Sequence, residues 1–302
     1  MAPRRMTAGL SVVVTGVIYN FAGELGYWDG DQGFGMAPLH RLSERGPLQH
    51  GATDTGARLD PRSVTIGVML PATDEATLED KRDLLLDLFR PRDTPVALRL
   101  YRANGQIRHL DAHTTGGLEF GSAQISRDYG GHIVLKTSID LVAPDPVWYD
   151  PAELAVSFGV AAGAGGMFVP TMVPTFIGAS TVDQTTQVPY DGSWLSNPII
   201  TIQGPITDPV VQNLTTGEKL SFVGFSLASG MTYTIDTRYG YKTVTDTSGG
   251  NRISELSTDS DLTGFHLEPD ASGNINTLRV TGSAANSATQ VFVRFRRNFI
   301  GV

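Results

Sequence analysis

Short segments in which apolar and polar residues alternate recur along this chain. Apolar residues occupy every second position over residues 64–70 and again over residues 96–101. A period of two is that of a half-buried β-strand, because successive side chains point to opposite faces. The 302 residues also include 34 glycines and 17 prolines, which suit tight turns and disfavour long helices. These features predict a mainly β protein.

The same reasoning predicts strands in both halves of the chain. In the first half we expect strands over residues 10–14, 17–21, 64–70, 96–101 and 132–142. In the second half we expect them over residues 198–202, 220–225, 232–236, 242–246, 277–280 and 290–296. Turn-forming residues at 215–218 and 270–273 separate some of these segments. Since no helix is expected beyond the Ala-Gly segment at residues 161–166, the second half is predicted to be a β-sandwich.

One helix is expected, over about residues 74–90. Thr73 is the predicted N-cap, and Asp74 and Glu75 suit the positive end of the helix dipole. Pro91 is expected to end the helix. Its predicted buried face consists of Leu78, Leu85, Leu88 and Phe89. An isolated helix between strands favours a β-sandwich that carries one helix over a parallel sheet.

A domain junction is expected at residues 143–146, where two prolines fall within three residues. A chain of 302 residues suggests about two domains. We therefore predict a first domain over residues 1–147 and a second over residues 148–302. The Ala-Gly segment over residues 161–166 has almost no side chains to pack, and we expect a flexible loop there.

Composition narrows the possible partners. The chain has no cysteine, which excludes disulfides, thiolate metal sites and cysteine nucleophiles. Its formal net charge of -8 disfavours nucleic-acid binding by the whole chain, because such binding needs Lys and Arg against phosphate. No segment approaches the ~20 apolar residues of a membrane helix, so we expect no membrane insertion. Residues 9–21 weakly resemble a signal peptide, but polar interruptions favour a first β-strand.

Few motifs suggest chemistry. His109, Asp111 and His113 would share one face of a strand, and no third ligand at metal-site spacing follows. The acidic glycine-rich stretch 29–33 lacks the rest of a calcium loop, and the cluster 259–261 is expected to be a solvated loop. No G-x-S-x-G, H-E-x-x-H or P-loop motif is present. We therefore predict no catalytic, cofactor-binding or metal-binding residues, and no enzyme.

Five aromatic residues of the second half leave two interpretations open. They could form a sugar-stacking platform, or they could serve as core and subunit contacts, which we prefer. The five are Tyr190, Trp194, Tyr233, Tyr239 and Tyr241.

Several short segments are each weak signals alone, but their order along the chain is informative. The first half contains GATDTG and LDPR within residues 51–62, then LDLFRP (86–91), GLEF (117–120) and APDPVWYD (143–150). The second half contains PIITIQGPI (198–206), NLTTG (213–217), IDTRYG (235–240) and FRR (295–297). Together these segments resemble the siphovirus tail-component family, the distal tail proteins of long-tailed bacteriophages. The resemblance covers nearly the whole chain.

The resemblance implies a structural protein of the virion tail tip, assembled in the host cytoplasm. The first domain would be a belt domain, six copies of which close into a ring around a lumen that passes DNA. The second would be a galectin-like β-sandwich. The ring would join the tail-tube protein to the tail-tip hub protein. We expect residues 51–62 to form a contact loop, so deleting residues 51–58 should abolish rings.

Two alternatives to this role stay open. One is a carbohydrate-binding module or adhesin for the host surface, since galectin-like domains can bind saccharides. The other is the same kind of ring in a gene-transfer particle or a contractile injection device.

Overall fold

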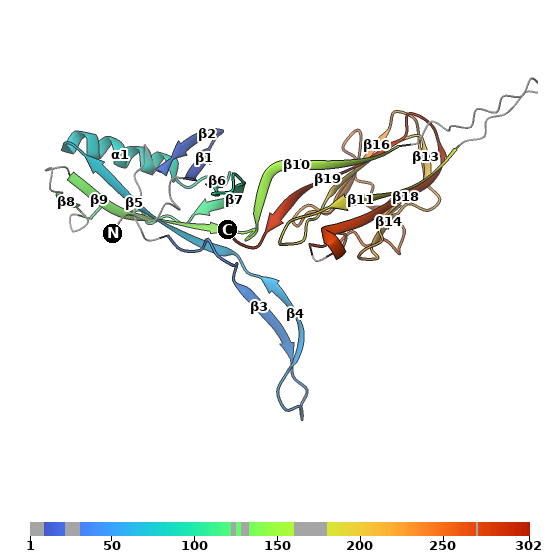
Figure 1. Cartoon of the computed structure of the whole chain (residues 1–302), viewed down its shortest axis with the longest axis horizontal. Helices are drawn as coiled ribbons and strands as arrows, with labels where there is room; N and C mark the ends of the chain where they lie inside the picture. Colours follow the sequence, from blue (N-terminus) through green and yellow to red (C-terminus); the bar gives the residue numbers. More distant parts are fainter. Residues whose placement is uncertain (1–8, 22–30, 122–124, 128–132, 160–179, 270) are drawn as a thin grey trace, which may run out of the picture. The chain divides into compact units, whose positions relative to one another are not determined.

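Antiparallel β-strands make up most of both halves of the chain in a computed structural model (Figure 1). The structure describes residues 9–21, 31–121, 125–127, 133–159, 180–269 and 271–302. That part of the chain contains one α-helix, which confirms the mainly β fold class. The Ala-Gly segment 161–166 lies outside the described residues.

The chain divides into two compact units. Unit 1 comprises Met1–Pro151 together with Phe299–Val302, and unit 2 comprises Ala152–Asn298. The last four residues thus return to unit 1, which sequence reasoning did not anticipate. Two long strands run across the division, β10 (Trp148–Gly159) and β19 (Gln290–Phe299).

Unit 1 contains two antiparallel layers. In the first, the strand order is β7-β6-β1-β2, and the strands are β1 (Leu10–Val14), β2 (Val17–Asn20), β6 (Val96–Tyr101) and β7 (Ile107–Thr114). In the second, β9 lies between β5 and β8, and the strands are β5 (Arg62–Ala72), β8 (Ile125–Arg127) and β9 (Ile133–Ala143). β5 and β9 pair over their full length, from Arg62 opposite Ala143 to Ala72 opposite Ile133. Their apolar faces enclose one core with those of β1 and β6.

The helix of unit 1 is α1 (Glu75–Leu88). Its four predicted apolar residues are all buried, which confirms the expected face. The predicted cap was wrong. Asp74 is the N-cap, with its Oδ1 accepting from the Thr77 backbone N at 2.8 Å. Thr73 instead donates its hydroxyl to the Asp74 carboxylate at 3.1 Å. A carboxylate at this position also gains from the helix dipole, which a hydroxyl does not.

A separate two-stranded hairpin projects from unit 1 (Figure 1). It consists of β3 (Leu39–Glu44) and β4 (Thr53–Leu59). The predicted contact loop over residues 51–62 is therefore mostly a strand, and its last residue, Arg62, already belongs to β5. Every residue of β3 is exposed. The hairpin is held by its own ladder and not by a core.

Unit 2 is a β-sandwich with one shared core. One sheet has the order β11-β18-β13-β14, with β15 paired to β13. In the other, β12 lies between β16 and β19, and β17 pairs with β16. The strands not yet given are β11 (Ser180–Pro189), β12 (Ile199–Gln203), β13 (Ile206–Asn213), β14 (Lys219–Ser221), β15 (Ser226–Leu227), β16 (Thr232–Asp236), β17 (Thr243–Asp246) and β18 (Ile275–Ala285). Ile200 and Val293 of one sheet and Val211 and Val280 of the other join the same buried cluster. In the described part of unit 2 the only helical segments are 3-10 turns at Ile253–Glu255 and Ser272–Asn274.

Candidate assembly surface

Arg62 fixes the base of the hairpin to the core of unit 1. This side chain is 1% exposed, and its guanidinium donates only to backbone carbonyls. Nε donates to the Pro146 oxygen at 2.7 Å, and Nη1 donates to the oxygens of Gly33 at 2.7 Å and Gly35 at 2.5 Å. Nη2 donates to the Ile300 oxygen at 2.7 Å. Burial lowers the pKa of Arg62 below its ordinary value, and the four carbonyl dipoles offset the cost of burying its charge.

Gly33 allows the chain to pass close to β5. Its φ is +86°, and a Cβ there would lie 2.1 Å from the Ser63 carbonyl oxygen. Next to it, Gln32 and Thr65 exchange backbone hydrogen bonds of 2.9 and 3.1 Å. Only glycine combines this φ with so close an approach. The segment before the hairpin is thereby pinned beside the strand that follows it.

Arg108 holds the returning residues 299–302 in unit 1. Its guanidinium carbon lies 3.8 Å from the ring centroid of Phe299, and its Nη1 donates to the Gly301 carbonyl oxygen. The Val302 backbone N donates to the Phe34 oxygen at 3.2 Å. Burial, helped by the nearby positive charge of Arg102, lowers the pKa of Arg108 to about 10.

The two strands of the hairpin present a mixed polar and apolar surface. Leu39 and Leu42 are each 41% exposed although they lie in a strand. Arg41 forms an ion pair and hydrogen bond with Asp54 across the ladder. The Asp60 backbone N donates to the Pro38 oxygen at 2.9 Å, which brings the two ends of the hairpin together. Among the described strands, none pairs with the outer edge of β3 or β4, and such open edges are a common template for association.

The tip of the hairpin, residues 45–50, is ordered by its own hydrogen bonds. The Gly46 backbone N donates to Gln49 Oε1 at 3.0 Å, and Gln49 Nε2 donates to Thr53 Oγ1 at 2.8 Å. Arg45 Nε donates to the Gln49 carbonyl oxygen at 3.2 Å. Leu48 stands at this turn with 95% of its surface exposed. Leu48 therefore presents nearly its whole apolar side chain to the surroundings at the end of the hairpin.

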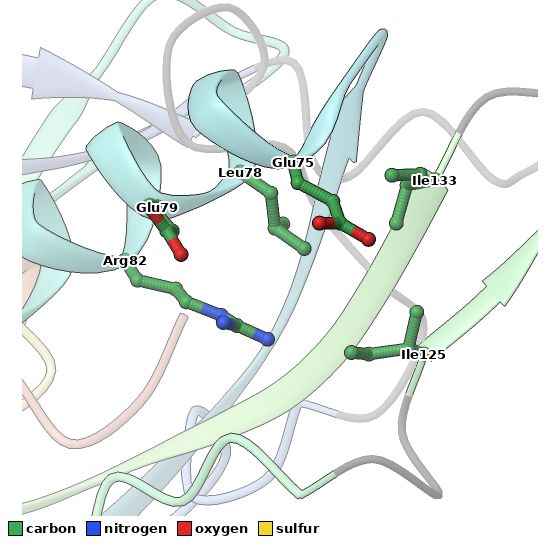
Figure 2. Close-up of a pocket in the computed structure, with 6 residues that line it drawn as sticks. All are labelled: Glu75, Leu78, Glu79, Arg82, Ile125 and Ile133. Carbon is green, nitrogen blue, oxygen red and sulfur yellow. The ribbon is translucent and has the colours of Figure 1, made fainter.

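A pocket lies where the first turns of α1 meet β8 and β9 (Figure 2). Its volume is about 220 Å³, and its lining residues are Glu75, Leu78, Glu79, Arg82, Ile125 and Ile133. Figure 2 shows Glu75 extending toward Ile133 and Arg82 extending toward Ile125. The pocket therefore has an apolar floor and a charged rim.

The structure places the sequence motifs away from any reactive cluster. His109, Asp111 and His113 share the less buried face of β7, opposite Leu110 and Ala112. Asp111 Oδ1 accepts from the Tyr149 hydroxyl at 2.9 Å. Across the described residues, no group of three or more His, Cys, Asp or Glu side chains is arranged to hold a metal ion.

The two acidic stretches differ in structure where they are described: the first contains a β-bridge and the second lies in a loop. Residues 29 and 30 lie outside the described part, while Gln32 pairs with β5. In the second stretch, Asp259 forms an ion pair with Lys219. Asp261 Oδ1 accepts from the backbone N atoms of Thr263 at 3.1 Å and Gly264 at 2.6 Å. These carboxylates satisfy local donors.

The five aromatic residues of unit 2 do not form one platform. Tyr190 and Tyr233 are core residues, 0% and 5% exposed, and Trp194 is half-buried. Only Tyr239 and Tyr241 are exposed, at 70% and 60%. Each of these two already has a cation over its ring, Lys242 Nζ at 4.8 Å and the Arg238 guanidinium at 4.4 Å, respectively.

Among the described residues, no helix has the length and apolar character needed to cross a membrane. Residues 32–139 match the family model of the phage tail protein RIFT-related domain. No curated protein sequence matches the chain.

Comparison of folds extends the match beyond the first unit. The SPP1 Dit (gp 19.1) protein, described as a paradigm of hub adsorption apparatus in phages that infect Gram-positive bacteria, aligns with a TM-score of 0.64 at 16% identity. The alignment covers 96% of this chain and 99% of that chain. A chain of the phage P2 baseplate in its activated conformation with Ca aligns at 10% identity over 95% and 97% of the two chains, with a TM-score of 0.45. This chain therefore matches the phage tail protein RIFT-related domain over residues 32–139 and has, over nearly its whole length, the fold of a siphophage distal tail protein.

Proposed function

We propose that this protein is a structural component of a phage tail tip, and that six copies close into a ring joining the tail tube to the tail-tip hub. The observation that carries the proposal is the full-length likeness to SPP1 Dit, which spans both units and leaves no large segment of either chain unmatched. The phage tail domain over residues 32–139 supports the same role. The role requires adhesive surfaces and no reaction.

The hairpin is the element of unit 1 best suited to self-association. A closed ring needs heterologous contacts, in which one patch meets a different patch on the next copy. β3 and β4 offer exposed leucines, charged side chains and two open strand edges. An arm that is exposed along nearly all of its two strands gains most from burial against another copy.

The ring would contact the tail-tube protein on one side and the hub protein on the other, and its lumen would pass DNA. The net charge of -8 is compatible with this path, because a strongly basic wall would retain phosphate. We place the protein in the virion, assembled in the host cytoplasm.

Native mass spectrometry of the full chain tests the ring. We expect a species near six times 32.4 kDa, alone or after addition of the tail-tube protein.

A variant without the hairpin tests which element forms the ring. In this variant a two-residue Asn-Gly turn replaces residues 40–58, since Pro38 and Asp60 already lie side by side. Deleting residues 51–58 alone would leave β3 unpaired. The variant should keep the circular dichroism of a folded β protein and lose the ring. A chain that stays monomeric with the tube protein, or a variant that still forms rings, argues against the proposal.

A further inference from the structure

The outer surface of α1 carries an excess of negative charge. Five acidic residues stand against Lys81 and Arg82, and they are Glu75, Glu79, Asp80, Asp83 and Asp87. Asp87 is paired with Arg90 and Arg92. Glu75 and Glu79, at the rim of the pocket, are exposed, and neither forms an ion pair within the part of the chain that the structure describes. Among the six residues that line the pocket, these two carboxylates stand against one basic side chain, Arg82.

The hairpin tip has the complementary character. Residues 45–50 contain Arg45 and no acidic residue. The Arg45 guanidinium is exposed and forms one local hydrogen bond, through Nε to the Gln49 carbonyl. Three residues further on, Leu48 is 95% exposed. The tip therefore offers one cation and one apolar side chain, and the pocket offers two carboxylates and one guanidinium around an apolar floor.

The tip and the pocket of one copy lie too far apart to meet. The hairpin leads into the first residue of β5, and the pocket begins just beyond its last residue. The 11 residues of β5 span roughly 36 Å at about 3.3 Å per residue. Figure 1 shows the hairpin pointing away from α1. A tip can reach a pocket of this kind only on a second copy.

We propose that the hairpin tip of one copy docks into the α1 pocket of the next, with Leu48 on the floor formed by Leu78, Ile125 and Ile133. Arg45 would then lie against Glu75 and Glu79. The proposal rests on the self-assembly proposed above and specifies its contact. Two different patches meet, so the contact is heterologous, and its repetition closes a ring when the rotation between copies allows.

The size of the pocket suits this occupant. Its volume of about 220 Å³ exceeds the roughly 150 Å³ of a cavity that accepts benzene. A leucine side chain, with four carbons, is smaller than benzene. The tip would serve as the anchor of the interface, and the rest of the hairpin would supply further buried area, as a stable interface requires.

Cysteine cross-linking tests the contact directly, because the natural chain contains no cysteine. We would combine Leu48→Cys with Ile125→Cys in the full chain and oxidise it at high concentration. Disulfides require Cα atoms within about 7 Å, so docking should give a ladder of covalent oligomers on a denaturing gel. The matched control combines Leu48→Cys with Leu86→Cys, since Leu86 is exposed on α1 but lies outside the pocket. The control and each single variant should give at most dimers.

A charge exchange gives an independent readout. Arg45→Glu and Glu79→Lys alone should each weaken assembly by roughly tenfold, as measured by native mass spectrometry across a concentration series. The two substitutions together should restore assembly, because the acidic and basic residues exchange positions and the charge pair is kept. Both sites are exposed, so neither change should unfold unit 1.

The outcomes separate this contact from the ring itself. A ladder with Ile125→Cys but not with Leu86→Cys supports the docking. Rings of the natural chain without that ladder overturn the docking and leave the ring standing. Equal ladders in both pairs also overturn it, since the tip would then have no preferred site. A natural chain that stays monomeric with the tube protein and gives no ladder overturns both proposals.

Discussion

Arg62 donates a hydrogen bond from its Nη2 to the carbonyl oxygen of Ile300 at 2.7 Å, across 238 residues of sequence. The same guanidinium also holds Gly33, Gly35 and Pro146. One side chain at the start of β5 thus joins the segment before the hairpin, the connection between β9 and β10, and the returning residues. No carboxylate takes part, so the arrangement depends on the planar fork of the guanidinium.

We expect Arg62→Met to destabilise unit 1 by about 3–5 kcal/mol, because several buried carbonyls lose their donor together. Urea unfolding followed by tryptophan fluorescence, to which Trp148 in the core of unit 1 contributes, measures the change. Arg58→Met is the matched control. Arg58 is exposed and forms an ion pair with Asp60 at 3.6 Å, so its loss should cost less than about 1 kcal/mol. Equal effects of the two substitutions would contradict the role given to Arg62.

The neighbours Leu85 and Leu86 separate the buried and exposed faces of α1. Leu85 is 0% exposed and Leu86 is 45% exposed. Leu85→Ala should cost about 2–5 kcal/mol through lost burial and a cavity, whereas Leu86→Ala should stay within about 0.5 kcal/mol. Thermal unfolding of both variants provides the comparison. A large loss at Leu86 would mean that this face is covered.

His266 makes the stability of unit 2 depend on pH. Its Nδ1 lies 2.6 Å from the Gly264 oxygen and 3.0 Å from Glu218, and its Nε2 lies 3.2 Å from Glu268. Burial opposes the charged form, but the Gly264 carbonyl and the two carboxylates outweigh it, so the pKa of His266 is raised.

Because the folded pKa of His266 is the higher one, its stabilising effect is complete below the unfolded value of about 6.5. The effect is lost as pH rises through the folded pKa. We expect the melting temperature of unit 2 to fall between pH 6 and pH 8.5, and His266→Gln to remove most of that slope. His113→Gln, on β7 of unit 1, should leave the slope unchanged. A slope that survives His266→Gln would show that another group titrates.

We expect the full chain to give no specific signal on a glycan array. The exposed rings of Tyr239 and Tyr241 already interact with Lys242 and Arg238, and the buried tyrosines cannot stack on a sugar. Strong binding to one saccharide that disappears in Tyr239→Ala or Tyr241→Ala would instead favour the adhesin. Ser257→Ala, which removes a hydroxyl group elsewhere in unit 2, serves as the control.

Sequence reasoning located the elements whose two faces differ. α1 and β5 follow their helical and strand periods closely, because one face of each enters the core of unit 1. β16 was predicted with its observed bounds for the same reason. The Asp74 cap was missed because Thr73 and Asp74 are neighbours and both are good N-cap residues. Only the geometry of the first helical turn decides between them.

Elements without such a pattern were missed. β11, with the sequence STVDQTTQVP, has few apolar residues, and β13 contains Pro209 beside Asp208 in a left-handed conformation. β3 and β4 are exposed on both faces, so they show no period at all. Leu48 could have been noticed as a leucine isolated among polar residues. The hydrogen-bond partners of Arg62 could not have been predicted, because they are backbone carbonyl groups and every residue has one.

The return of residues 299–302 to unit 1 also determines when that unit can finish folding. Arg62 emerges from the ribosome 238 residues before Ile300. At about 5–20 residues per second, this interval lasts roughly 10–50 seconds. Unit 1 must wait through the synthesis of all of unit 2 with one carbonyl partner of its buried cation still missing. Nascent chains therefore complete the anchor at the base of the hairpin only after unit 2 has been synthesised.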